Sequence, residues 1–302
     1  MFHQQVSTYA GIVVCIYSCV NRGLSTFFSL GQVLATHRSR HSIFGGPFQP
    51  TISQAIRLLS SQPFSIRDPI GLSTDAASKP SMRLSSPDIL DPFSEASLTY
   101  STNGTDTIPA PSAYKSRRHA WIHIFPEGYI HQHPQKIMRY FRWGVSRLIL
   151  ESEPLPDIVP IWIDGTQDCM HESRTFPRFL PRVGRKVRIA FGDLVDGENV
   201  FGAARRRWRE LVTQQYETLR KQGREGELVM GDLTEELKFG KEAVELRMEV
   251  TRLVRAEVMK VRQRLGYADE DPKNGLVETW REEGLDTGDV GRQRDGSWIK
   301  PA

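Results

Sequence analysis

The chain has 302 residues, of which 39% are hydrophobic and 25% are charged, and its formal net charge is +4. This length allows one domain of about 150–200 residues together with additional segments. The composition suits a soluble or peripheral globular protein and excludes a polytopic membrane protein, because the sequence contains no run of about 18 apolar residues. The three cysteines match no zinc-binding spacing, and their odd number argues against a disulfide framework.

The first segment, residues 1–66, contains two apolar stretches. Residues 9–20 (YAGIVVCIYSCV) are too few to span a bilayer, so we expect a buried strand or helix, with insertion into one leaflet as the alternative. No lysine or arginine precedes Arg22, and a convincing mitochondrial presequence or secretory signal is therefore not expected. Residues 51–60 (TISQAIRLLS) predict a helix.

Residues 67–118 are rich in serine, threonine and proline, as in SKPSMRLSSPDILDPFSEAS. Branched apolar residues are few, and no helical or strand period is sustained. Such a segment buries too little apolar surface to offset the entropy of ordering. We therefore predict a disordered insertion.

Residues 119–196 return to a globular pattern. Residues 120–125 (AWIHIF), 158–163 (IVPIWI) and 186–191 (KVRIAF) read as strands, and residues 137–151 read as a helix. Strands that alternate with helices favour an α/β domain with parallel elements.

The remaining chain is helical and then polar. Apolar residues at helical spacing predict helices over residues 203–220 and 241–265, within a helical extension that covers 197–266. The tail at 267–302 is polar and is predicted to be loose. The expected fold class is thus α/β: a mixed sheet flanked by helices, with a disordered insertion and a helical C-terminal extension.

The motif with the clearest chemical meaning is FPEG at Phe125, Pro126, Glu127 and Gly128. Pro126 ends the preceding strand, and Gly128 permits a tight turn and close approach of a ligand to the backbone. The motif thus presents Glu127 at the carboxyl end of a strand, where open α/β sheets bind ligands. A carboxylate repels phosphate, so we expect Glu127 to accept a hydrogen bond from a glycerol hydroxyl or to orient an arginine. The alternative is an ordinary turn from strand to loop.

The context of this motif resembles the glycerophospholipid acyltransferase superfamily, and within it the tafazzin type. The resemblance runs through HIFPEG, MRYFRWGVSRLI and IVPIW, and upstream through FFSLGQVLATHR and GPFQPTISQAIRLL. It covers about residues 24–66 and 119–196. Residues 125–128 match the third motif of that family, and Val159 and Pro160 lie where the fourth motif falls.

The resemblance implies which residues contact a lysophospholipid. Arg38 is the best candidate for binding phosphate, since a guanidinium fork matches phosphate oxygens; Arg40 is a weaker alternative. Phe125 to Gly128 and Pro160 are the other expected substrate contacts. Three arginines in the expected helix after the motif are weaker candidates, because helix arginines usually form a solvated face: Arg139, Arg142 and Arg147.

One departure from the family concerns its first motif, a histidine, four residues and an aspartate. The histidine acts as general base on a glycerol hydroxyl, and the aspartate fixes its tautomer. None of the eight histidines here has an aspartate at the fifth following position, and the first aspartate is Asp68. Either the chain is incomplete, which we favour, or it is a paralogue without catalysis. In both cases we expect no useful rate of acyl transfer, and the catalytic residues are unknown.

Two other kinds of site are disfavoured. His119, His123, His131 and His133 could together form a metal centre, but a core histidine and a polar loop are the simpler interpretation, so no metal is expected. The basic run at residues 205–209 (RRRWR) spreads around a helix, and no nucleic-acid partner is expected.

The resemblance further implies an O-acyltransferase that needs neither a thioester donor nor a cofactor. Its partners would be phospholipids and lysophospholipids, with cardiolipin among them. The implied location is the face of a mitochondrial membrane, inner or outer, with peripheral association. The alternative is a noncatalytic phospholipid-binding or scaffold protein that keeps Arg38 and Glu127 but lacks a base.

Overall fold

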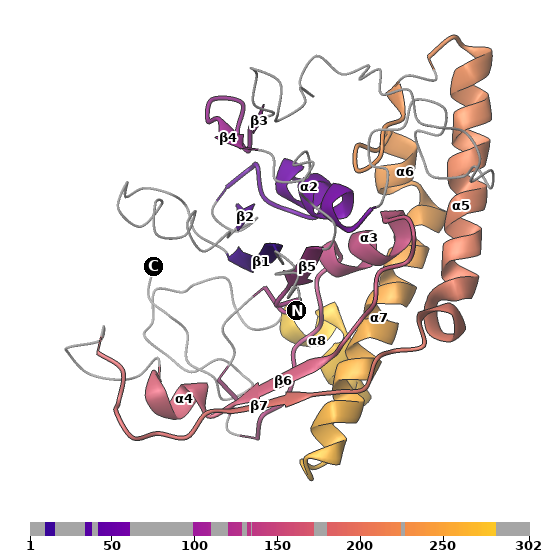
Figure 1. Cartoon of the computed structure of the whole chain (residues 1–302). Coiled ribbons are helices and arrows are strands. Elements are labelled where there is room, and N and C mark those ends of the chain that lie inside the picture. The colour runs from indigo at the N-terminus through magenta and orange to yellow at the C-terminus, as the bar shows by residue number, and fades with distance from the viewer. Residues whose placement is uncertain are drawn as a thin grey trace, which may run out of the picture. The chain divides into compact units, whose positions relative to one another are not determined.

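The computed structural model describes part of the chain. The described residues are 10–15, 34–37, 42–60, 99–109, 120–128, 132–133, 135–171, 180–224 and 227–281. The strands are β1 (Ala10–Cys15), β2 (Leu34–Ala35), β3 (Thr99–Tyr100), β4 (Ile108–Pro109), β5 (Ala120–His123), β6 (Ile161–Asp164) and β7 (Arg188–Phe191). The helices are α2 (Pro50–Leu59), α3 (Gly144–Glu151), α4 (Thr166–Cys169), α5 (Gly197–Lys221), α6 (Glu235–Phe239), α7 (Lys241–Arg264) and α8 (Val277–Arg281), with a 3₁₀ turn η3 (Pro272–Gly275) (Figure 1).

The chain divides into two compact units that are not consecutive in sequence. Unit 1 comprises Met1–Pro126, Trp143–Pro156 and Phe201–Val250. Unit 2 comprises Glu127–Arg142, Asp157–Val200 and Thr251–Ala302. Both contain helices and strands, which confirms a mixed α/β fold, although helices outweigh strands among the described residues.

Unit 1 contains a parallel three-stranded sheet in the order β2-β1-β5. Helix α2 packs beside it because Ile52, Ala55 and Ile56 fall on one face, while Pro50 occupies the first turn, where a backbone donor is dispensable. The apolar cluster under this helix consists of Leu34, Ile52, Ala55, Ile56, Leu58, Leu148 and Met230. The predicted helix at 51–60 and the predicted strand at 120–125 are thereby confirmed.

A hairpin formed by β3 and β4 lies inside the segment predicted to be a disordered insertion. Its turn is organised by Asp106, whose Oδ1 accepts hydrogen bonds from Ser101 Oγ and from the backbone N–H of Thr102, both at 2.7 Å. Residues 99–109 of this segment are therefore an ordered hairpin. A carboxylate that caps several donors of a tight turn orders a short polar segment without a hydrophobic period.

Helices α5 and α7 contribute the buried arginines Arg205 and Arg247 to unit 1. The Arg205 guanidinium is 1% exposed, donates to the Ser152 carbonyl at 3.0 Å, and pairs with Glu153 at 2.9 Å. The predicted helices at 203–220 and 241–265 are confirmed as α5 and α7. The basic run at residues 205–209 does spread around α5, and Arg205 falls on its buried side, where its guanidinium binds carbonyls at the end of α3.

In unit 2, β6 and β7 form an antiparallel ribbon, so the expectation of parallel elements holds for β1, β2 and β5 but not here. Trp162 of β6 is buried on one side of the ribbon, where its ring meets that of Tyr267 at 5.7 Å between centroids. The described residues between β6 and β7 are 165–171 and 180–187. Only the short helix α4 occurs among them.

The predicted helix over residues 137–151 begins only at Gly144. The preceding residues are held by two arginines of α7 that lie seven residues, about two helical turns, apart. Arg255 donates to the carbonyl of Met138 at 2.8 Å, and Arg262 donates to that of Lys136 at 3.0 Å. Because the arginine side chains donate hydrogen bonds to these carbonyls, the carbonyls need no partner within a helix. The apolar spacing alone therefore predicted a helix start that is too early.

Two predictions at the ends of the chain also have outcomes. Residues 10–15 form strand β1, as one expectation for the apolar segment at 9–20 allowed. The tail predicted to be loose contains η3 and α8, which are ordered elements. Asp271 accepts a hydrogen bond from the Lys273 N–H at 2.9 Å and caps η3. A short turn that is held by such a cap has no apolar periodicity, so the sequence pattern did not reveal it.

Candidate functional site

The FPEG motif directly follows strand β5, as the sequence predicted. The Phe125 side chain is 51% exposed, and its ring lies 4.5 Å from that of His123 between centroids. Burial lowers the pKa of His123 below its ordinary value, which favours the neutral imidazole. The exposed Phe125 ring and the His123 imidazole thus lie together at this end of β5.

Glu127 points its carboxyl group into unit 2. Its Oε1 accepts a hydrogen bond from the Arg139 backbone N–H at 3.3 Å. Desolvation raises the pKa of this carboxyl from 4.5 to about 7, against the opposing effect of that hydrogen bond and of Arg139 and Arg255. Near neutral pH, Glu127 therefore exists in both protonation states and can act as either donor or acceptor.

A buried ion cluster lies in the same unit. The Glu270 side chain is 1% exposed and pairs with Arg255 at 2.6 Å and with Arg262 at 3.2 Å. Its other contact is the Met138 N–H, which donates at 2.8 Å. Two α7 arginines and one carboxylate thus fix the backbone that follows the FPEG turn, including Arg139, whose N–H reaches Glu127.

Gly128 has φ +61°, which lies in the left-handed region, where a residue with a side chain would be strained. A Cβ atom placed there would lie 2.7 Å from Cδ of Arg142, so the Arg142 side chain passes directly over the glycine. The sequence predicted that a ligand would approach the backbone closely at Gly128. In the structure, the group that approaches closely is the Arg142 side chain.

The three weaker arginine candidates differ in their surroundings. Arg147 is 1% exposed and forms a bidentate pair with Glu151, with both N···O distances 2.6 Å. Arg139 is buried, with its guanidinium 4.3 Å from the centroid of the Trp280 ring. Arg142 alone of the three is exposed. The environment of Arg147 is that of a structural residue, and Arg142 is the one that an incoming anion can reach.

Pro160 is buried in unit 2, and its carbonyl accepts a hydrogen bond from the Gly192 N–H at 2.8 Å. Its ring packs so closely on Gly192 that a Cβ added to the glycine would lie 2.6 Å from Pro160 Cγ. The described contacts of Pro160 are thus packing contacts at the entrance to β6. Whether it touches substrate stays a prediction.

Arg38 and Arg40, the expected phosphate ligands, lie outside the described residues. The neighbouring His37 is described: its Nε2 and the Thr102 Oγ1 are 2.8 Å apart, and its N–H donates to Gln49 Oε1 at 2.8 Å. Convergence of Arg38 with residues 125–128 on one head-group pocket therefore remains a prediction.

The histidine cluster considered as a metal centre is described only in part. His119 and His131 lie outside the described residues, whereas His133 Nδ1 accepts a hydrogen bond from the Gln135 N–H at 3.1 Å. Within the described ranges, no group of three or more histidine, cysteine, aspartate or glutamate side chains could hold a metal ion. The turn at His133 is that of a polar loop.

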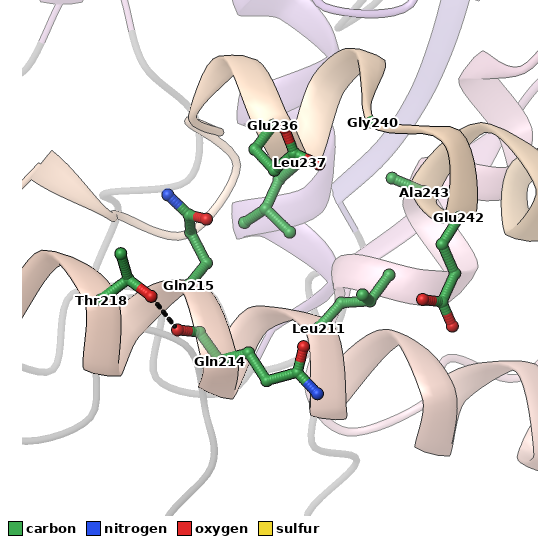
Figure 2. A pocket seen from close by; sticks show the side chains of 9 residues that line it. All are labelled: Leu211, Gln214, Gln215, Thr218, Glu236, Leu237, Gly240, Glu242 and Ala243. Atoms are coloured by element: carbon green, nitrogen blue, oxygen red, sulfur yellow. Dashed lines mark hydrogen bonds between the residues drawn. The ribbon is translucent and has the colours of Figure 1, made fainter.

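A surface pocket of about 200 Å³ lies in unit 1 among α5, α6 and α7. Figure 2 shows side chains from these helices around it, and Thr218 Oγ1 donates to the Gln214 carbonyl at 2.8 Å. The lining residues are Leu211, Gln214, Gln215, Thr218, Glu236, Leu237, Gly240, Glu242 and Ala243. None of them was predicted from the sequence to contact substrate, and two of the side chains are carboxylates, which repel a phosphate.

Sequence reasoning missed Arg255, Arg262 and Glu270, which fix the chain beside Glu127. The seven-residue spacing of the two arginines was a usable signal, because residues 255 and 262 fall beside the apolar stripe of Val254, Val258 and Val261. Charged residues in that position are candidates for burial with a partner. The partner, Glu270, lies in the tail that was predicted to be loose, so no sequence pattern connected them.

Comparison with known proteins gives one extended match and several short ones. The chain is 32% identical to "Tafazzin" of Saccharomyces cerevisiae over 274 residues, which is 86% of this chain and 60% of the yeast protein. It is 34% identical over 76 residues to "Tafazzin" of Drosophila melanogaster, covering 25% of this chain and 19% of that protein. It is 38% identical over 74 residues to "Taffazin" of Dictyostelium discoideum, covering 24% and 25%. No protein-family model matches the chain.

The chain thus spans about three-fifths of its yeast relative and a quarter or less of the two others. In the described part of the chain, no helix is both long enough and apolar enough to cross a bilayer.

Proposed function

The chain is a homologue of the tafazzins, and from this relationship we propose that it acts on membrane phospholipids as a transacylase of that type. The reaction would move a fatty acyl chain from a phospholipid to a lysophospholipid, with cardiolipin among the substrates. It would need no thioester donor, metal or cofactor. The place of action would be the face of a mitochondrial membrane, inner or outer, with peripheral association.

The observation that carries this proposal is the identity of 32% with yeast tafazzin across 86% of the chain. The geometry of the FPEG turn supports it. Gly128 adopts the left-handed conformation that brings the backbone close to a neighbour, and Glu127 is held by the Arg139 N–H at the start of unit 2. A carboxyl group with a pKa of about 7 can donate to, or accept from, a glycerol hydroxyl.

We assign the phosphate of the lysophospholipid to Arg38, with Phe125 and Gly128 beside the glycerol and Pro160 at the entrance to β6. The exposed Arg142, whose side chain passes over Gly128, is a second cation that the phosphate can reach. A guanidinium can bind two phosphate oxygens at once, whereas a lysine presents a single point charge.

Catalysis itself needs a base that these 302 residues do not present in the family's arrangement, since no histidine is followed at the fifth position by aspartate. General base catalysis is worth about 10²–10⁴-fold in rate. We therefore propose that this polypeptide is an incomplete or inactive form. The same observation favours the second candidate function, a noncatalytic protein that binds phospholipid and serves as a scaffold on a mitochondrial membrane.

A transacylase assay tests the proposal. Phosphatidylcholine with a labelled acyl chain and monolysocardiolipin would be incubated with this chain, and with the same chain joined to an upstream segment that carries the histidine and aspartate. We expect label in cardiolipin only with the longer protein. Transfer by neither protein, together with no binding of lysophospholipid, would refute the assignment; binding without transfer by either would favour the scaffold.

Arg38→Ala in the longer protein tests the phosphate assignment. Loss of a charge-assisted contact to phosphate should lower kcat/KM for the lysophospholipid by about 10–100-fold, which corresponds to about 1.5–3 kcal/mol. Preference among acyl donors should change little. Arg206→Ala, an exposed arginine of α5, is the control, and equal activity of the Arg38 variant and its parent would reject the role.

A further inference from the structure

Strand β7 carries an exposed row of apolar side chains in unit 2. Ile189 is 55% exposed and Phe191 is 65% exposed, and Val187, directly before the strand, is also exposed. Residues two apart in a strand point to the same face, so Ile189 and Phe191 share one side of the ribbon. The strands of this ribbon lie antiparallel in Figure 1.

The opposite side of the ribbon is covered. Trp162 pairs with Ala190 across the two strands and is buried. The Arg262 guanidinium of α7 lies 6.0 Å from the centroid of its ring, and Tyr267 lies beside it. The ribbon is therefore one-sided: its α7 side is packed, and the side that carries Ile189 and Phe191 faces solvent.

The described connection that leads into β7 extends the exposed surface and adds charge. Val183 is 97% exposed, and Leu180 is exposed as well. No acidic residue occurs from residue 180 to residue 191. The β7 docking surface, as we name it, combines the apolar residues Leu180, Val183, Val187, Ile189 and Phe191 with the exposed cations Arg182, Arg185 and Lys186.

The chemistry of this surface indicates its occupant. Several exposed apolar side chains along one stretch of chain mark an interaction site, because their exposure to water is unfavourable. Apolar side chains that insert at the boundary of head groups and acyl chains, flanked by cations, suit an anionic bilayer surface. A second copy of the chain is a poorer match, since an isologous contact would bring these cations against their own equivalents.

We propose that the β7 docking surface binds the surface of anionic phospholipid membranes, with Val183, Ile189 and Phe191 inserted among the lipids and the three cations paired with head-group phosphates. This inference rests on the membrane-lipid function proposed above and adds the face that meets the bilayer. It concerns binding alone and needs no acyl transfer.

The cationic part is tested by sedimentation of the full chain with vesicles of phosphatidylcholine, and with vesicles that also contain phosphatidylglycerol. The wild-type chain should bind the anionic vesicles preferentially. Each cation near an anionic surface contributes about fivefold to binding, so Arg182→Gln, Arg185→Gln and Lys186→Gln combined should weaken it about 100-fold. Raised salt should weaken wild-type binding and affect the triple variant less.

A second triple variant controls for net charge. Arg206→Gln, Lys221→Gln and Arg252→Gln remove the same three charges from exposed positions on α5 and α7. If this control and the triple variant at residues 182, 185 and 186 lose affinity for anionic vesicles equally, the effect is one of overall charge and the docking surface is refuted. If the wild-type chain binds no vesicle, both this inference and the membrane part of the proposed function fail.

The apolar part is tested by a substitution that should strengthen membrane binding without disturbing the fold. Val183 is almost fully exposed, so Val183→Trp leaves packing intact and should strengthen binding to anionic vesicles about tenfold. Its fluorescence should be quenched by lipids brominated in their acyl chains. Unchanged affinity and no added quenching would overturn insertion at this loop, whereas transacylase activity of the longer protein in detergent would be unaffected by that result.

Discussion

Glu127 shows how one residue can be identified from sequence while its electrostatics come from its surroundings. The FPEG motif placed a carboxylate after a strand, and β5 does end at His123. Burial raises the pKa of this carboxyl to about 7, while Arg139 and Arg255 oppose the shift and Glu270 adds to it, and these residues come near Glu127 only through the fold.

The shifted pKa of Glu127 predicts a pH-dependent contribution to stability. Because the folded-state pKa lies above the ordinary 4.5, the folded chain keeps a proton that the unfolded chain releases, and stability falls as pH rises from about 4.5 through 7. Glu127→Gln removes this dependence. Relative to wild type, its free energy of unfolding should rise by about 1–3 kcal/mol between about pH 5 and about pH 8.

Urea unfolding of both proteins at the two pH values measures this difference. The sign is the informative part, because a carboxylate stabilised by Arg139 and Arg255 would give the reverse trend. A difference between variant and wild type that stays constant with pH would contradict the raised pKa.

The buried pair of Arg255 and Glu270 gives a second prediction. Arg255→Ala leaves the Glu270 carboxylate, 1% exposed, without its contact at 2.6 Å. Removal of one partner from a buried ion pair costs about 3–5 kcal/mol. Arg264→Ala is the matched control on the same helix, because its pair with Asp193 is exposed and should contribute less than about 1 kcal/mol. Denaturant midpoints compare the two, and equal losses would show that the Arg255 pair is not structurally important.

At the scale of elements, helices with a sustained apolar stripe were predicted well and shorter elements less well. Helices α2, α5 and α7 appear close to their predicted bounds because their own spacing determines which face is buried. The segment before Gly144 also has helical spacing, but Arg255 and Arg262 take its carbonyls. A local pattern contains no information about donors that lie more than a hundred residues away.

The packing of β7 beside α7 gives a prediction at this scale. A Cβ on Gly192 would lie 2.6 Å from Pro160 Cγ and 2.7 Å from Val261 Cγ2. Both neighbours are constrained, one by a ring and one by its helix, so Gly192→Ala should destabilise the chain by about 1–3 kcal/mol.

A double-mutant cycle with Val261→Ala measures whether this overlap is the cause. Val261→Ala makes room, and the double variant should therefore lose less stability than the sum of the two single losses. Thermal or denaturant unfolding gives the three values. Strict additivity would mean that Gly192 and Val261 do not meet.

At the scale of the molecule, the similarity to yeast tafazzin and the division into two units tell different things about the chain. Identity to yeast tafazzin extends over 86% of the chain, well beyond the two blocks in which individual motifs were recognisable. The structure adds two compact units, each assembled from separated stretches, and α5 and α7 each contribute residues to both. Sequence order did not predict this interleaving, because it arises from contacts between distant segments.

The sequence by itself determined the tafazzin relationship, the long helices and the position of the FPEG turn, since these depend on local spacing and on residue identity. Only the tertiary structure decided that Arg147 is paired in the core and Arg142 is exposed, that Glu127 lies beside the buried cluster of Glu270, and that one face of β7 is open. Burial and electrostatics are set by whatever approaches a residue in space. In this chain the approaching groups come largely from α7 and the segment after it, which lie more than a hundred residues beyond the motif they support.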